Sequence, residues 1–378
     1  MATLLLFFFR LLIVSSVTVL LIGLFKPEWL RFRGKQPDLL LTSAIAFGLF
    51  IAGFTGASRT YYIPNAEISK ASKAGVRINE AVYNTEAISS GCRAGAKPGN
   101  AGASDGEKTR DGIHFSVRTP SNYKDTIAHP LLMVYAPAGR DREEAEEHVY
   151  LTSEATAAGF VIAYADHQPL SPESVVKLAE IPQLIQEKWC IDKNRIFLTG
   201  HSDGGTVAMG IAFFNGTKHI PAAIAPSAVG MRGEDLQDRN CVKPTPVMLM
   251  HSSRDKLFPN YGKEAIEWWA NCNKCTTKTY KASDRKAPDS GKKWGWEKYY
   301  KQELEQKALD LKPGQPLPFT TPVPGVEGCM AYSGCKNGVQ TWFCEGSGPH
   351  PEWPGKNKEI IAFFKGTNSE NGKNTPSQ

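Results

Sequence analysis

One serine of this chain lies in a pattern that can turn a hydroxyl into a nucleophile. The pattern Gly-x-Ser-x-Gly runs from Gly200 to Gly204, with Ser202 at its centre and apolar stretches at 195–199 and 205–214 on either side. The first stretch predicts a buried strand and the second a helix, and a sharp turn between two such elements is a nucleophile elbow. Glycines permit that turn, and the helix N-terminus offers N–H donors to an oxyanion. These residues predict covalent catalysis by Ser202, whereas a tight turn without chemistry is the alternative.

The pattern occurs a second time, from Gly102 to Gly106 around Ser104. No apolar strand precedes this copy and no amphipathic helix follows it, and it lies within the Gly-, Ala- and Lys-rich stretch 91–111. We interpret it as a flexible loop. The flanking segments therefore single out Ser202.

A serine nucleophile needs a histidine base and a carboxylate that orients the base. In α/β-hydrolases these partners follow the serine in the order acid, then histidine, on loops after later strands. Asp255 follows the apolar run 246–250, and His350 lies in a glycine-rich loop after the apolar run 339–343. We predict Asp255 as the acid and His350 as the base, and we expect His251 to support the loop of the acid.

The oxyanion of the reaction needs two backbone donors. The N–H of Asp203 is the first candidate, and Ala138 or Gly139 supplies the second, because Pro137 has no N–H. His201 and Trp353 adjoin the predicted nucleophile and base and are candidates for substrate contacts. The chemistry requires no metal and no organic cofactor.

Short apolar strands alternate with helices over the region that carries these residues. This alternation predicts an α/β fold with a mostly parallel sheet covered by helices on both faces. The predicted strands are 131–135, 160–164, 195–199, 222–225, 246–250 and 339–343, and the predicted helices are 171–188, 205–214 and 356–364.

The N-terminus has a different composition. Residues 4–25 are apolar apart from Arg10 and a few hydroxyl residues, and 39–54 form a second apolar run. The short segment between them carries four Lys or Arg residues against two acidic ones. This composition predicts a membrane anchor or signal region over residues 1–57. Positive charge marks the cytoplasmic side, so Ser202 is expected outside the cytoplasm, on an anchored domain or on one secreted after cleavage.

The cysteines fit an exported domain. The chain has eight, an even number that predicts up to four disulfides whose pairing the sequence leaves open. Cys272 and Cys275 also match half of a zinc site, but no second half accompanies them.

The remaining boundaries follow from composition. We expect a linker over 58–111, a catalytic domain over 112–366 with an insertion at 282–328, and a disordered tail over 367–378. The net charge of +6 comes without an Arg-rich block or a nucleic-acid-binding motif, so we expect no nucleic-acid partner. The sequence leaves the oligomeric state open.

Residues 91–366 resemble the polyhydroxybutyrate depolymerase and feruloyl esterase group of α/β-hydrolases. The resembling segments are 190–205, 246–262, 269–272 and 346–355. The resemblance implies an α/β-hydrolase fold, an ester substrate that is small or polymeric, and the roles of nucleophile, acid and base for Ser202, Asp255 and His350. This chain departs from the group at Asp203, where Asn is usual, and at residues 135–139, where the group has His-Gly.

A second function stays open. The insertion contains Trp294, Trp296, Tyr299 and Tyr300. A non-catalytic extracytoplasmic protein on a hydrolase scaffold could use such aromatic residues to bind a polymer or a partner. A peptidase or acyltransferase would share the same three catalytic residues.

Overall fold

A computed structural model describes the chain over residues 11, 13–18, 47–51, 74–83, 91–214, 216–217, 221–237, 239–279, 316–318 and 320–367. The chain divides into two units, Met1–Ala74 and Gly75–Gln378, and the fold below is that of the second. Most of the predicted membrane segments 4–25 and 39–54 lies outside the described residues. Among the helices that are described, none is both long enough and apolar enough to cross a membrane.

Ten strands of the described chain form one mixed sheet in the order β1-β2-β4-β3-β5-β6-β7-β12-β11-β10. The adjacent strands β4, β3, β5, β6, β7 and β12 pair in parallel, whereas β1, β2, β10 and β11 pair antiparallel with their neighbours. The bounds of these strands are β1 (Ala103–Lys108), β2 (His114–Arg118), β3 (His129–Tyr135), β4 (Val161–Ala165), β5 (Ile191–His201), β6 (Ala223–Ser227), β7 (Val247–Ser252), β10 (Thr320–Pro322), β11 (Cys329–Tyr332) and β12 (Thr341–Gly346).

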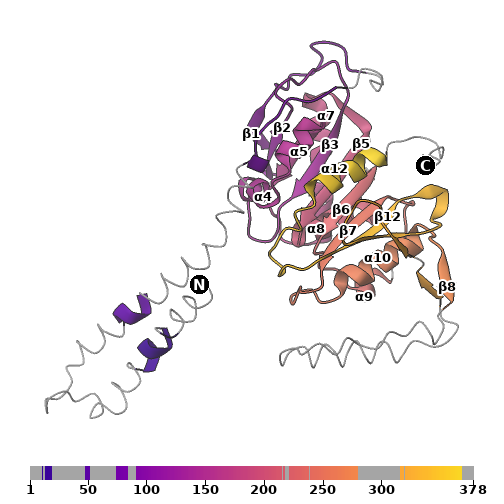
Figure 1. Cartoon of the computed structure of the whole chain (residues 1–378). Helices are drawn as coiled ribbons and strands as arrows, with labels where there is room; N and C mark the ends of the chain where they lie inside the picture. Colours follow the sequence, from indigo (N-terminus) through magenta and orange to yellow (C-terminus); the bar gives the residue numbers. More distant parts are fainter. Residues whose placement is uncertain are drawn as a thin grey trace. The chain divides into compact units, whose positions relative to one another are not determined.

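Helices cover both faces of this sheet, as Figure 1 shows. Side chains alternate along each strand, so Leu131 and Met133 pack into one core while Leu132 and Val134 pack into the other. The first core contains apolar residues of α6 (Pro172–Leu178), α7 (Ile181–Lys188), α8 (Asp203–Phe213), α9 (Gly233–Leu236) and α10 (Tyr261–Cys272), and the second those of α4 (Arg142–Val149), α5 (Thr152–Ala157) and α12 (Asn357–Gly366).

This arrangement is the α/β-hydrolase fold, as predicted. The second strand of the sheet is antiparallel, the chain crosses over between β3 and β4, and β5 lies in the middle of the sheet. The C-terminal ends of β5, β7 and β12 therefore meet at one edge, where a site of this fold is built.

The prediction of one helix over 171–188 is wrong, because this segment contains two helices. Ser171 caps α6 through its hydroxyl and Pro172 occupies the first turn, but α6 ends at Leu178. A new helix, α7, starts at Ile181 and holds Pro182 in its own first turn. A proline costs little there, because its missing N–H would have had no acceptor within the helix.

The interpretation of 91–111 as a loop is also wrong, but only at residues 103–108. Residues Ala103–Lys108 form β1, which pairs antiparallel with β2. Its side chains are mostly exposed or half-buried, so the strand lacks the apolar alternation by which strands are recognised. The guanidinium of Arg118 joins the strand to the domain, at 2.6 Å from Asp105 and 2.7 Å from the buried Glu146.

The eight cysteines form four disulfides, Cys92–Cys190, Cys241–Cys272, Cys275–Cys335 and Cys329–Cys344. Cys272 and Cys275 thus have different partners. Disulfides persist in oxidising compartments, so these four indicate a location outside the cytoplasm.

Most of the predicted insertion 282–328 lies outside the described residues, and so does the tail beyond Thr367. Within the described part of the insertion, β9 (Pro316–Pro318) pairs with β8 (Thr277–Thr279), and β10 joins the main sheet. A short 3-10 helix, η4, covers Lys336–Gly338.

Candidate active site

Ser202 occupies the strained turn between β5 and α8. Its φ of 56° and ψ of −119° lie in a region that residues with a Cβ rarely adopt. Two neighbouring glycines are sterically required, because a Cβ at Gly204 would collide with the Tyr135 carbonyl and one at Gly200 would collide with the Gly204 backbone. The Ser202 N–H donates to the Ser227 carbonyl of β6 at 2.9 Å. The turn is therefore fixed by the sheet on both sides.

His350 reaches this serine from the loop between β12 and α12. The Ser202 Oγ lies 2.9 Å from His350 Nε2, although the two residues are 148 positions apart in the chain. The loop is held at its start by the Ser252 hydroxyl, which donates to the Gly348 carbonyl. The structure thus brings the predicted nucleophile and the predicted base into hydrogen-bonding contact.

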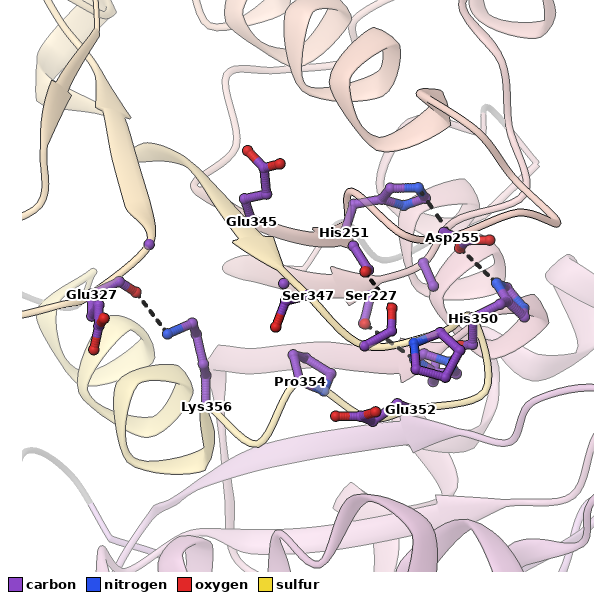
Figure 2. A pocket seen from close by; sticks show the side chains of 17 residues that line it. Ser227, His251, Asp255, Glu327, Glu345, Ser347, His350, Glu352, Pro354 and Lys356 are labelled. Atoms are coloured by element: carbon purple, nitrogen blue, oxygen red, sulfur yellow. Dashed lines mark hydrogen bonds and ion pairs between the residues drawn. The ribbon is translucent and has the colours of Figure 1, made fainter. Parts of the chain in front are cut away.

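Asp255 completes the chain of hydrogen bonds from the loop after β7. Its Oδ2 lies 2.7 Å from His350 Nδ1, and its Oδ1 accepts the backbone N–H groups of Leu257 and Phe258 at 2.9 Å each. Figure 2 shows the carboxylate between the rings of His251 and His350.

The surroundings of Asp255 keep it ionised. Burial favours the neutral acid, since the residue is 3% exposed, but the hydrogen bonds from His350 and the Phe258 N–H outweigh burial, so the pKa of Asp255 lies below its ordinary value. An ionised carboxylate only accepts hydrogen bonds, so Nδ1 of His350 carries the ring proton. Nε2 is then free to accept the proton of the Ser202 hydroxyl.

The predicted oxyanion donors lie in two backbone segments. Asp203 is the first residue of α8, and a first-turn N–H has no acceptor within its helix. Pro137 to Arg140 form a turn closed by an N–H to carbonyl bond of 3.2 Å, with Gly139 at a φ of 72°. In the part of the chain that the structure describes, neither the Ala138 nor the Gly139 N–H donates to a protein acceptor. Their role as donors stays a prediction.

The side chain of Asp203 has a partner that the sequence did not indicate. Its Oδ2 lies 3.0 Å from Nε2 of His167, in the loop after β4. His167 precedes Asp255 in the chain, so it does not fit the order acid, then histidine, that a base of this fold follows, and the structure places it against the carboxylate beside the nucleophile.

His201 and Trp353, the predicted substrate contacts, are both buried beside the base loop. They are 2% and 5% exposed, and the Trp353 indole donates to the Asn357 side chain at 2.8 Å. Both ring nitrogens of His201 have protein partners, the Ser227 hydroxyl at 3.1 Å and the His350 carbonyl at 2.6 Å. These contacts engage the polar atoms of both side chains and support the base loop, while His201 also lines the pocket beside that loop. The role of His201 and Trp353 in substrate contact stays a prediction.

Phe258 is a neighbour of the base that sequence reasoning missed. Its ring meets the His350 ring edge-on, with centroids 4.7 Å apart, and its carbonyl lies 2.9 Å from His251 Nε2. The latter bond confirms that His251 supports the loop of the acid. A signal was present, because Phe258 follows Asp255 by three positions and an Asp side chain commonly binds the backbone just after it.

A pocket of about 280 Å³ lies beside the base loop, and Figure 2 shows its lining. Its lining includes Asp255 and His350 together with Glu327, Glu345, Glu352 and Lys356. Within the described residues, no group of His, Cys, Asp and Glu side chains is arranged to hold a metal ion.

The chain matches no protein-family model and no curated protein sequence. Several solved structures are similar to it in fold. An acetyl xylan esterase from Aspergillus awamori is 13% identical over 66% of this chain and 94% of its own, with a TM-score of 0.43. A thermophilic esterase from Thermogutta terrifontis is 14% identical over 55% of this chain and 91% of its own, with a TM-score of 0.36.

A third structure is MGS-M1, an alpha/beta hydrolase from a deep-sea metagenome library. It is 16% identical over 46% of this chain and 79% of its own, with a TM-score of 0.37. Similarity at this level assigns no activity to the present chain, since one fold hosts many functions.

Proposed function

We propose that this protein is a serine esterase that cleaves carboxylic esters through an acyl-enzyme. The proposal is carried by the two hydrogen bonds that join Ser202 Oγ to His350 Nε2 at 2.9 Å and His350 Nδ1 to Asp255 Oδ2 at 2.7 Å. Nucleophile, base and orienting acid are within hydrogen-bonding reach of one another, as covalent catalysis requires.

The reaction proceeds in two halves. Ser202 Oγ attacks the ester carbonyl while His350 Nε2 takes its proton, and the imidazolium that forms is stabilised by Asp255. His350 then gives the proton to the leaving alcohol, and the acyl group stays on Ser202. A water molecule attacks the acyl-enzyme while His350 takes its proton, and His350 then returns that proton to Ser202 Oγ as the acid leaves. The N–H groups of Asp203 and of Ala138 or Gly139 hold the oxyanion in both halves.

Polyhydroxyalkanoate or feruloyl-type esters are the proposed substrates, in keeping with the resemblance in residues 190–205 and 346–355. We further propose that the N-terminal apolar segments attach the catalytic domain to the membrane on its outer side. The four disulfides are consistent with this compartment.

A panel of esters tests the substrate class. Short p-nitrophenyl esters, 3-hydroxybutyrate oligomers and methyl ferulate are each offered to the full chain, with Ser202→Ala as the blank. We expect turnover that the blank lacks, and the ratio of kcat/KM values then ranks the acyl groups. Polymer binding without turnover of any ester would favour the non-catalytic alternative.

A further inference from the structure

We propose that His201 positions the catalytic base by holding the backbone of His350, a role that rests on the proposed triad. His201 Nε2 lies 2.6 Å from the carbonyl oxygen of His350, and the two residues are 149 positions apart. The residue directly before the nucleophile thus bonds the backbone of the base itself. The relative position of nucleophile and base is therefore set by this backbone tether as well as by their side chains.

The contacts of His201 fix both its tautomer and its orientation. A carbonyl oxygen only accepts hydrogen bonds, so Nε2 of His201 carries the proton. Nδ1 then accepts from the Ser227 hydroxyl, at 3.1 Å. Ser227 is 2% exposed and lies opposite His201 in the pairing of β5 with β6. The ring is therefore held between a strand of the sheet and the base loop.

Neighbouring rings fill the space around His201. The rings of His148 and Trp353 meet it edge-on, with centroids 5.2 Å and 6.1 Å away. Packing of this kind restricts the ring to one rotamer. A rigid donor at this place can hold a loop that would otherwise move.

The loop of His350 needs such a donor because it contains little regular structure. Gly348 and Gly355 make it permissive, and no helix or strand lies between β12 and α12. The side chain of His350 bonds Asp255 and Ser202, but these bonds do not fix where its backbone lies. A displacement of about 1 Å at a catalytic group can lower a rate by about 100-fold.

His201 is also suited to its position by its charge. Burial lowers the pKa of His201 to about 4, and the charges of His350 and Arg140 act in the same direction. The hydrogen bond to the His350 carbonyl and the charge of Asp255 act in the opposite direction. His201 is therefore neutral at neutral pH. The His350 imidazolium, whose ring centroid is 5.6 Å away, forms without a second cation beside it.

Two substitutions of similar size separate this role from simple packing. The amide nitrogen of Gln in His201→Gln can reach the place of Nε2 and donate to the His350 carbonyl. The shorter side chain in His201→Asn reaches only the place of Nδ1 and Ser227. We expect His201→Gln to keep kcat within about fivefold of the wild type, and His201→Asn to lower kcat about 10- to 100-fold with KM nearly unchanged.

The measurements are kcat and KM for a p-nitrophenyl ester and the labelling rate by a fluorophosphonate, with thermal unfolding as the check on folding. Equal kcat values for the two variants, or a His201→Asn variant within threefold of the wild type, would overturn the proposal. Should His201→Asn not fold, His201→Leu takes its place with the same expectation. A wild type that neither turns over esters nor reacts with the probe refutes the proposed esterase, whereas an active wild type and indistinguishable variants refute only the role of His201.

Discussion

His350 Nδ1 lies 2.7 Å from Asp255 Oδ2, and the same carboxylate accepts two backbone N–H groups of its own loop through Oδ1. Asp255 thus holds the loop after β7 in shape while it orients the ring that follows β12. Because the carboxylate is ionised and 3% exposed, its preference for the Nδ1–H tautomer of His350 is strong.

Replacing the Asp255 carboxylate by an amide should remove the hydrogen bond that orients the His350 ring while the size of the side chain stays the same. Asp255→Asn can present an amide N–H to His350, which favours the tautomer that cannot accept the proton of Ser202. We expect kcat for a p-nitrophenyl ester to fall by about 10³- to 10⁴-fold. Asp111→Asn, at an exposed position, is the control and should leave kcat unchanged. A loss of less than tenfold in Asp255→Asn would remove Asp255 from the triad.

The backbone strain at Ser202 predicts that a side chain at this position, which catalysis requires, lowers the stability of the fold. Both Ser202→Gly and Ser202→Ala lose the hydroxyl, but only glycine adopts a φ of 56° without strain. We expect Ser202→Gly to have a free energy of unfolding about 1 kcal/mol above that of Ser202→Ala. Denaturant titration of the two inactive variants measures the difference, and equal stabilities would mean that the turn stores no strain.

The buried histidines make the protein sensitive to mild acid. Burial lowers the pKa of His201 to about 4 and that of His148 to about 3, whereas an unfolded histidine titrates near 6.5. As the pH falls from about 6.5 to about 4, the unfolded chain binds protons that the folded protein does not, so the free energy of unfolding falls.

His201→Gln should flatten this pH dependence, because it removes one such group. His114→Gln is the matched control, since His114 is exposed. Unfolding free energies measured at intervals from pH 7 to pH 4 test the expectation. A slope in His201→Gln equal to that of the wild type would show that His201 is not a neutral buried histidine.

The turn after β3 offers a test of the second oxyanion donor. Gly139 has a positive φ at the third position of the turn, so the second position, Ala138, is one where proline is favoured. Ala138→Pro should preserve the turn while it removes one N–H. We expect kcat to fall by about 10²- to 10³-fold with KM little changed. An unchanged kcat would leave Gly139 as the donor.

The sequence predicts the elements of this fold that carry apolar patterns. The central strands and the three residues brought together at their ends follow from apolar runs, glycine-rich turns and chain order. The strand β1 is missed because its exposed, polar residues gain their place through backbone pairing with β2 and through Arg118. Nothing in its local composition distinguishes it from a loop.

Contacts between distant segments are harder to predict. His201 was expected to touch the substrate because it adjoins Ser202, yet its ring is buried against a loop 149 positions away. The pair of His167 with Asp203 is another case, since it depends on how the loop after β4 meets the first turn of α8. Chain order selects which residues reach the sheet edge, whereas packing decides which of them contact one another.

The most direct test of the proposed esterase is covalent labelling at the nucleophile. The full chain is treated with a fluorophosphonate, the modified peptide is identified by mass spectrometry, and hydrolysis of p-nitrophenyl butyrate is followed in the same sample. We predict modification at Ser202, loss of hydrolysis in proportion to labelling, and neither labelling nor hydrolysis in Ser202→Ala. Hydrolysis that survives in Ser202→Ala, or a label found on another residue, would contradict the account.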